Sequence, residues 1–193
     1  MFYKTVKALV KGFLRVFFRV EVIGESNIPK DNSCLICANH SSNWDPVFLV
    51  AFTKRKINFM AKAEVFKIPV LKWILLKFGA FPVQRGKADI GAVKKSMGIL
   101  NSGEVLGMFP TGTRNSDEES AEVKSGAALI ATRCGTTVLP VYIKANKFVI
   151  FSKVKIIYGA PLDMSDYKGK KPDQEELKDI ANNIYKNIIE LSK

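Results

Sequence analysis

The sequence predicts a single α/β domain: a largely parallel mixed sheet covered by helices, preceded by an N-terminal amphipathic helix at a membrane interface. Three observations predict it. The chain has 193 residues, 47% of them hydrophobic and 25% charged, enough to bury one core. Short apolar, strand-like runs alternate with longer helical patterns. No internal repeat and no Pro/Gly-rich linker divides the chain, so residues 23–193 are expected to form one domain after an N-terminal segment of residues 1–22.

The N-terminal segment is the most strongly amphipathic part of the sequence. Its basic residues recur at spacings of three or four and so share one helical face: Lys4, Lys7, Lys11, Arg15 and Arg19. Phe, Leu and Val fill most of the remainder. A basic stripe beside a wide apolar face is typical of a helix lying in an anionic membrane interface. Packing of this helix on the domain core is an equally good interpretation, and no uncharged apolar run there is long enough to span a bilayer.

The later elements follow from the same patterns. Strands are expected at residues 34–38, 57–61, 80–84, 105–109, 137–143 and 154–158. Helices are expected at residues 45–53, 64–78, 88–100, 123–133 and 174–191.

One of these segments, "VFKIPVLKWILLKFGAF" (residues 65–81), is a second candidate for membrane contact. Lysines interrupt its apolar residues at every fifth position, which excludes a spanning helix. Trp73 and its aliphatic neighbours make a bulky surface with cationic edges, as membrane-interface segments have. For this segment alone, an ordinary buried helix is the simpler interpretation.

The formal net charge of +12 indicates an anionic partner: nucleic acid, anionic lipid or a phosphorylated substrate. A nucleic-acid-binding module is disfavoured, because the N-terminal basic residues oppose an apolar face and do not interleave with aromatic residues for stacking. Three cysteines and no visible secretory signal favour a reducing, cytosolic setting. Cys34 and Cys37 lie within an apolar run, so we expect buried thiols there and neither a metal site nor a cofactor.

The only histidine of the chain lies in "ICANHSSNWDP". His40 follows an apolar run, and Asp45 and Pro46 have the residue types of a helix N-cap and a first helical residue. The simplest interpretation is that Asp45 only caps the helix and that His40 is an ordinary polar loop residue. A tight loop would also bring the Asp45 carboxylate to the His40 ring, where it fixes the tautomer and stabilises the imidazolium. This is the chemistry of a general base with its orienting group.

A nucleophile for that base is harder to find within the chain. No G-x-S-x-G motif occurs, and the three cysteines lie in apolar patterns. We therefore expect the base to deprotonate a hydroxyl of the substrate itself.

Cationic residues follow other expected strands. Arg85 follows one in "GAFPVQRG", Gly112, Thr113 and Arg114 follow another in "GMFPTGTRN", and Lys62 ends a third. Functional groups collect at the carboxyl ends of parallel strands, and arginine forks suit phosphate oxygens. The spacing does not match a P-loop. Each cation alone could be a solvated surface charge, but their recurrence at successive strand ends favours an anion site.

The order of H-x4-D (His40, Asp45), "FPVQRG", "FPTGTRN" and "VLPVYI" resembles the four sequence blocks of the glycerolipid acyltransferases, and within them the 1-acyl-glycerol-3-phosphate (lysophosphatidic acid) acyltransferases. "AKAEVF" resembles the lysine-containing segment of that branch. The resemblance extends from about residue 29 to residue 161. It implies transfer of an acyl chain from acyl-coenzyme A or acyl-carrier protein to the sn-2 hydroxyl of the acceptor, giving phosphatidic acid. Residues 23–193 would then be the acyltransferase domain.

Carried over residue by residue, the resemblance implies that His40 is the general base and Asp45 its orienting group. Lys62, Arg85 and Arg114 would bind the acceptor phosphate. It further implies a lysophospholipid acceptor and a peripheral position on the cytoplasmic face of an anionic membrane, with no nucleic-acid partner.

The loop of the third block is the point of departure from the family. Gly112 and Thr113 would shape this loop, but Thr111 replaces the usual acidic residue. This change leaves open acylation of glycerol-3-phosphate or another lysolipid, and a catalytically silent lipid-binding relative.

Overall fold

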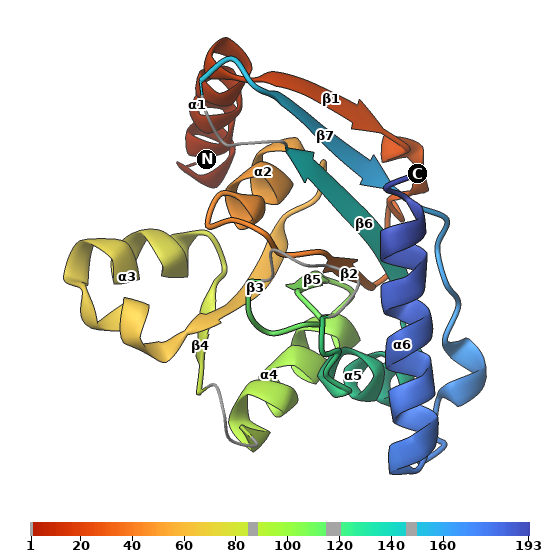
Figure 1. Cartoon of the computed structure of the whole chain (residues 1–193). Coiled ribbons are helices and arrows are strands. Elements are labelled where there is room, and N and C mark those ends of the chain that lie inside the picture. Colours follow the sequence, from red (N-terminus) through yellow and green to blue (C-terminus); the bar gives the residue numbers. More distant parts are fainter. Residues whose placement is uncertain (1, 85–88, 115–120, 146–149) are drawn as a thin grey trace.

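The computed structural model describes residues 2–84, 89–114, 121–145 and 150–193. Within these ranges the chain forms a seven-stranded sheet of order β1-β7-β6-β2-β5-β3-β4 (Figure 1). The strands are β1 (Arg19–Ile23), β2 (Cys34–Ala38), β3 (Ile57–Lys62), β4 (Phe81–Val83), β5 (Val105–Met108), β6 (Thr137–Ala145) and β7 (Lys153–Tyr158). The β6–β7 pair is antiparallel, and every other neighbouring pair is parallel.

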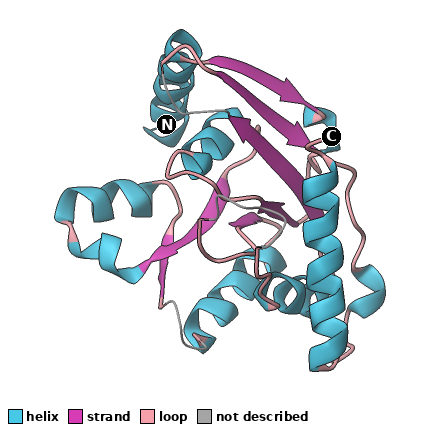
Figure 2. Ribbon diagram, viewed as in Figure 1, coloured by secondary structure: helices cyan, strands magenta, loops and turns pink. Residues whose placement is uncertain are grey.

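Helices cover both faces of the sheet (Figure 2). They are α1 (Phe2–Phe17), α2 (Asp45–Phe52), α3 (Pro69–Lys77), α4 (Ile90–Asn101), α5 (Gly126–Cys134) and α6 (Gln174–Glu190). The central strand β2 is buried throughout: Ile36 packs with α1 and α2, while Leu35 packs with α4, α5 and α6. A strand buried on both faces reads as a continuous apolar run, as "CLICA" does.

The predicted single α/β domain with a mostly parallel sheet is confirmed. Each strand expected from residue 34 onward is present, with ends shifted by at most two residues. The helix expected at residues 64–78 is broken in two: a 3-10 segment, η2 (Ala63–Lys67), precedes α3. Pro69 explains the break, because proline lacks the N–H that a continuous helix needs and disfavours helical geometry at Ile68.

The predicted N-terminal helix is too long. The structure ends α1 at Phe17, and Arg19–Ile23 forms the edge strand β1, which pairs in parallel with β7. Val20 and Val22 alternate here with Arg19 and Glu21, which is the period of a strand. Glu21 also forms ion pairs with Lys153 and Lys155 of β7, at 3.0 and 3.6 Å.

The basic stripe of α1 turns partly toward the protein. Lys7 donates to the Thr53 carbonyl at the end of α2, and Lys11 lies over the Phe52 ring at 5.3 Å from its centroid. Part of the apolar face packs inward through Leu14, whereas Leu9, Phe13 and Val16 are exposed. Among the described residues, no helix has the length and apolar character needed to cross a membrane.

Candidate active site

The strand order brings distant sequence motifs to one edge of the sheet. Strands β2, β5, β3 and β4 are neighbours, so the loops that follow them open at their carboxyl ends on the same side. His40 follows β2, Thr111 follows β5 and Lys62 ends β3. Arg85 follows β4 in sequence but lies outside the described residues.

His40 and Asp45 form the hydrogen-bonded pair that the spacing predicts. The His40 Nδ1 atom lies 2.8 Å from Asp45 Oδ2, and the same oxygen accepts hydrogen bonds from the backbone N–H groups of Ser41 and Ser42, at 2.8 and 2.7 Å. With Nδ1–H donating, Nε2 is the ring nitrogen left to accept a proton. The Asp45 side chain is fully buried, and its Oδ1 has no hydrogen-bond partner among the described residues.

The carboxylate reaches this position in a different way from the one expected. Asp45 is the first residue of α2 rather than its N-cap, and Trp44 occupies the N-cap position. A carboxylate at the cap would bond forward to the helix. From the first helical position it bonds back into the His40 loop, so it organises that loop and still lies at the positive end of the helix.

Asn39, which the sequence did not single out, anchors the start of the loop. Its side chain is buried, donates to the Ile143 carbonyl at 3.1 Å and accepts from the Ile143 N–H at 2.8 Å. An amide side chain thereby continues the β2–β6 ladder one residue past the strand. Pro140 and Val141, of the fourth block, lie in β6 opposite Cys37 and Ala38, the last two residues of β2 before this loop.

A stack of aromatic rings holds one face of the imidazole. The Phe109 ring stacks on His40 with centroids 4.1 Å apart, and Phe59 stacks on Phe109 at 5.9 Å. The Phe59 ring fits only because residue 107 is glycine: a Cβ there would lie 2.3 Å from the Phe59 ring. No sequence period predicts this stack, because its three rings come from β3 and from the loops that follow β2 and β5.

A hydrogen bond from a side chain of the loop itself stabilises the turn after β5. Thr111, 3% exposed, donates to the Thr113 carbonyl at 2.8 Å, so the hydroxyl that replaces the expected acid serves the loop turn. Gly112 adopts a left-handed conformation (φ 68°), and the Lys124 side chain packs against it. Lys124 was expected in the helix at residues 123–133, but α5 begins only at Gly126. Its backbone N–H donates to the Pro110 carbonyl at 2.9 Å, which brings Lys124 to the site.

The two described candidate phosphate ligands are exposed. Lys62 forms an ion pair with Glu64 at 3.5 Å, and about half of its side chain is exposed. Arg114 is exposed as well. The structure thus brings His40 and Asp45 into contact, whereas it leaves these cations at the rim without contact to that pair.

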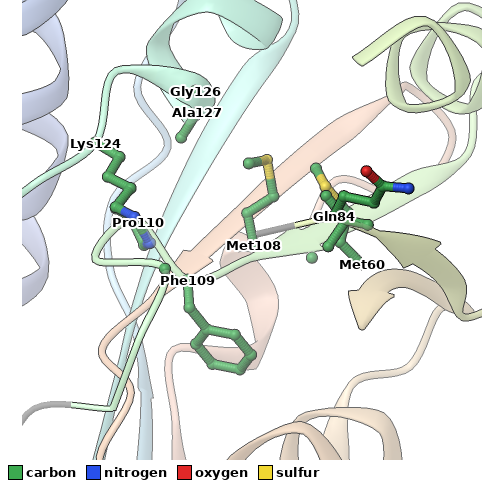
Figure 3. Close-up of a pocket in the computed structure, with 11 residues that line it drawn as sticks. Met60, Gln84, Met108, Phe109, Pro110, Lys124, Gly126 and Ala127 are labelled. Carbon is green, nitrogen blue, oxygen red and sulfur yellow. The ribbon is translucent and has the colours of Figure 1, made fainter. Parts of the chain in front are cut away.

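A cavity of about 250 Å³ adjoins the site on the α4–α5 side of the sheet edge. Its walls are largely apolar: Met108 lies between Lys124 on one side and Met60 and Gln84 on the other (Figure 3). Phe109 lines this cavity and also stacks on the His40 ring. The cavity therefore begins one side chain away from the imidazole.

The two cysteines of β2 do not suit a nucleophilic role. Cys34 and Cys37 are fully buried, and burial raises the pKa of Cys34 to about 12 and that of Cys37 well above its usual range. A thiol with such a pKa stays protonated at neutral pH and is unreactive. Within the described parts of the chain, no group of three His, Cys, Asp or Glu side chains could hold a metal ion.

Comparison with known proteins adds independent findings. A family model described as "Acyltransferase" matches residues 19–144. The 1-acyl-sn-glycerol-3-phosphate acyltransferase of Streptococcus pneumoniae is 33% identical over 192 residues, covering 95% of this chain and 70% of its own. That of Bacillus subtilis is 30% identical, covering 98% and 96%. The crystal structure of the 1-acyl-sn-glycerophosphate (LPA) acyltransferase PlsC from Thermotoga maritima superposes with a TM-score of 0.73 at 26% identity, over 98% of this chain and 81% of that one.

Proposed function

Because this chain belongs to the acyltransferase family, we propose that it acylates the sn-2 hydroxyl of 1-acyl-glycerol-3-phosphate to form phosphatidic acid, with His40 as the general base. The observation that carries the proposal is the His40–Asp45 contact at a sheet edge whose rim carries the exposed cations Lys62 and Arg114. The names of the similar proteins from S. pneumoniae and B. subtilis support the acceptor.

The chemistry needs no nucleophile from the protein. His40 Nε2 takes the proton of the acceptor hydroxyl while its oxygen attacks the thioester carbonyl carbon, and Asp45 stabilises the imidazolium. The tetrahedral intermediate then collapses, the carbon–sulfur bond breaks, and the imidazolium returns the proton to the leaving thiolate. The donor is an acyl thioester of coenzyme A or of acyl-carrier protein, and the buried thiols support direct transfer without an acyl-enzyme.

The surroundings of the pair offer a binding site for each part of the substrates. The apolar cavity beside Phe109 suits an acyl chain. Arg114, Lys62 and Arg85 are assigned to the acceptor phosphate, which an arginine fork can bind through two oxygens. The exposure of Arg114 and Lys62 leaves these two side chains free to close on the phosphate.

The proposed setting is the cytoplasmic face of an anionic membrane, with the protein attached peripherally. The exposed Leu9, Phe13 and Val16 of α1 support this setting, because they present an apolar strip to the outside beside basic flanks. A net charge of +12 favours both an anionic lipid surface and an acidic donor.

An acceptor panel tests the proposal. Purified protein on vesicles is given a long-chain thioester and one of three acceptors: 1-acyl-glycerol-3-phosphate, glycerol-3-phosphate or a monoacylglycerol without phosphate. Product mass is the readout. We expect turnover with the first acceptor, and His40→Ala should lower kcat by about 10²–10⁴-fold. Asn43→Ala, at an exposed position of the same loop, is the control and should keep wild-type activity.

Two outcomes would contradict this function. His40→Ala protein with near wild-type turnover would remove the general base from the mechanism. Vesicle binding without turnover on any acceptor and donor would identify a catalytically silent lipid-binding relative.

A further inference from the structure

Helix α3 leaves its apolar side chains uncovered. The structure describes all of Pro69–Lys77, and none of these residues is buried. Val70 is 71% exposed and Trp73 51%, and Ile68, Ile74 and Leu76 are exposed as well. The helix projects away from the sheet and packs mainly on η2, the turn that precedes it (Figure 1). The simpler interpretation of this segment, an ordinary buried helix, is therefore wrong.

The exposed apolar residues occupy one broad side of the helix. At 3.6 residues per turn, Leu76, Trp73, Val70 and Ile74 cover an arc of about 160°. A surface helix packs on a protein core through an apolar stripe of roughly 100° or more. Soluble proteins rarely expose contiguous apolar surface of this kind, and when they do it marks a protein or membrane contact. The wide arc favours a fluid apolar partner that can contact the helix from several sides.

The charge on this segment has one sign. Lys67, Lys72 and Lys77 are exposed, and no Asp or Glu occurs between Val65 and Phe81. Lysine side chains can bury their methylene stems while the ammonium reaches the headgroups. Tryptophan is likewise suited to the boundary between headgroups and acyl chains. Apolar residues with cationic edges match an anionic bilayer surface.

We propose that α3 is a second membrane contact, separate from α1, and that it lies in the interface of an anionic bilayer. This inference rests on the proposed function, because the contact would let a lipid acceptor reach the site from the membrane. Tyr3 of α1 and Phe78 after α3 lie with ring centroids 5.4 Å apart, so the two helices adjoin. Only the five residues of η2 separate Lys62, at the rim of the site, from Ile68. Attachment at two points holds the carboxyl edge of the sheet against the membrane.

Tryptophan fluorescence tests the contact directly. The chain has two tryptophans, Trp44 and Trp73, so Trp44→Phe leaves Trp73 as the sole probe. Full-length protein is mixed with phosphatidylglycerol–phosphatidylcholine vesicles whose acyl chains are brominated at defined depths. We expect quenching of Trp73, strongest for bromines near the headgroup end of the chains. A Trp73 emission that bromolipids do not quench while the protein cosediments with the vesicles would overturn the proposal.

Binding measurements give a second readout. Val70→Ser and Trp73→Ser should each raise the apparent Kd for the same vesicles by about tenfold, the equivalent of one lost apolar contact. Ile90→Ser is the matched control, because Ile90 is 67% exposed but lies at the start of α4; its Kd should stay at the wild-type value. Equal losses for Val70→Ser and Ile90→Ser would contradict a specific role of α3.

The outcomes separate this inference from the proposed function. Turnover that depends on His40, together with an unquenched Trp73, would leave the enzyme intact and remove α3 from the membrane. Quenching of Trp73 without turnover on any acceptor would keep the membrane contact of α3 and contradict the proposed enzymatic function. A lipid-free dimer, seen by sedimentation and abolished by Trp73→Ser, would assign the surface to a second copy of the chain and overturn the lipid contact. Binding of acyl-carrier protein that Val70→Ser abolishes, with vesicle binding unchanged, would also overturn it.

Discussion

The loop after β2 and the loops after β3 and β5 open at the same sheet edge, yet their functional side chains are held very differently. Around His40, one carboxylate oxygen accepts three hydrogen bonds, Asn39 fixes the loop start and Phe109 covers the ring. Arg114 and Lys62 are exposed, and in the described part of the chain Lys62 forms a long ion pair with Glu64. The groups proposed to transfer a proton are thus positioned by the fold itself, whereas the cations proposed to bind phosphate are left to adjust to the substrate.

This difference has a physical reason. General-base catalysis depends on geometry that costs no rearrangement during the reaction, and buried hydrogen bonds provide it. A phosphate group, in contrast, must enter and leave, and cations on mobile side chains allow both at a moderate cost in binding. Mutations should therefore affect kcat in the first region and KM in the second.

The largest effect is expected from Asp45→Asn, which tests whether the carboxylate orients His40. The amide keeps the size of the side chain but removes its charge and lets the ring adopt the wrong tautomer. We expect kcat to fall on the order of 10³-fold with little change in KM, measured by steady-state acyl transfer. Thermal unfolding checks that the fold survives. A fall of less than about tenfold would mean that the loop positions His40 without the carboxylate.

The aromatic stack predicts the next largest effect. Gly107→Ala places a methyl group against the Phe59 ring, and the displaced ring pushes on Phe109 and so on His40. Overpacking of this kind lowers the free energy of unfolding by about 1–3 kcal/mol, and we expect a fall in kcat as well. Denaturant unfolding and kinetics measure the two.

Two further variants sharpen this test. Adding Phe59→Leu to Gly107→Ala should restore part of both losses, because the smaller side chain makes room for the methyl group. Gly98→Ala is the control: no atom lies within 4 Å of the new Cβ, so this helix position should gain up to about 1 kcal/mol. Unchanged kcat in Gly107→Ala would show that the stack does not position the imidazole.

Arg114→Ala tests the second region. Losing one charged hydrogen-bond partner of the phosphate should raise the apparent KM for 1-acyl-glycerol-3-phosphate by roughly tenfold or more, with a smaller change in kcat. Arg133→Ala, an exposed arginine in the last turn of α5, is the control and should behave as wild type. If kcat fell while KM stayed constant, Arg114 would act in the transition state and the contrast between the two regions would break down.

The smallest expected effect is a pH dependence of the free energy of unfolding, caused by the two cysteines of β2. Burial raises the pKa of Cys34 to about 12, and that of Cys37 is raised as well, while unfolded thiols titrate near 8.5. Between these values the folded state binds more protons than the unfolded state, so stability falls as pH rises. We expect a loss of about 1 kcal/mol per thiol between pH 8 and pH 9.5. Urea unfolding of wild type and of the Cys34→Ala/Cys37→Ala variant measures it; equal slopes in the two proteins would contradict it.

Local patterns were enough to predict most elements and the central pair. The apolar run "CLICA", the polar loop after it and Pro46 together placed a strand, a loop and a helix, since each depends on residues that are neighbours in sequence. The spacing of His40 and Asp45 predicted their contact for the same reason: five residues across one turn leave few other arrangements. The order of the motifs sufficed to indicate the acyltransferase family.

What sequence could not decide depended on partners far along the chain. Residues 19–23 form a strand because their backbone pairs with that of β7, more than 130 residues later in the chain. The basic side of α1 turned toward α2 because the Thr53 carbonyl accepts Lys7. Helix α3 kept its apolar side chains exposed because it packs mainly on η2 and not on the sheet. Phe59, Gly107 and Phe109 act on His40 only through the alignment of three strands. Periodicity in the sequence shows which face of an element is apolar. Only the assembled sheet determines whether that face packs on another element or stays exposed.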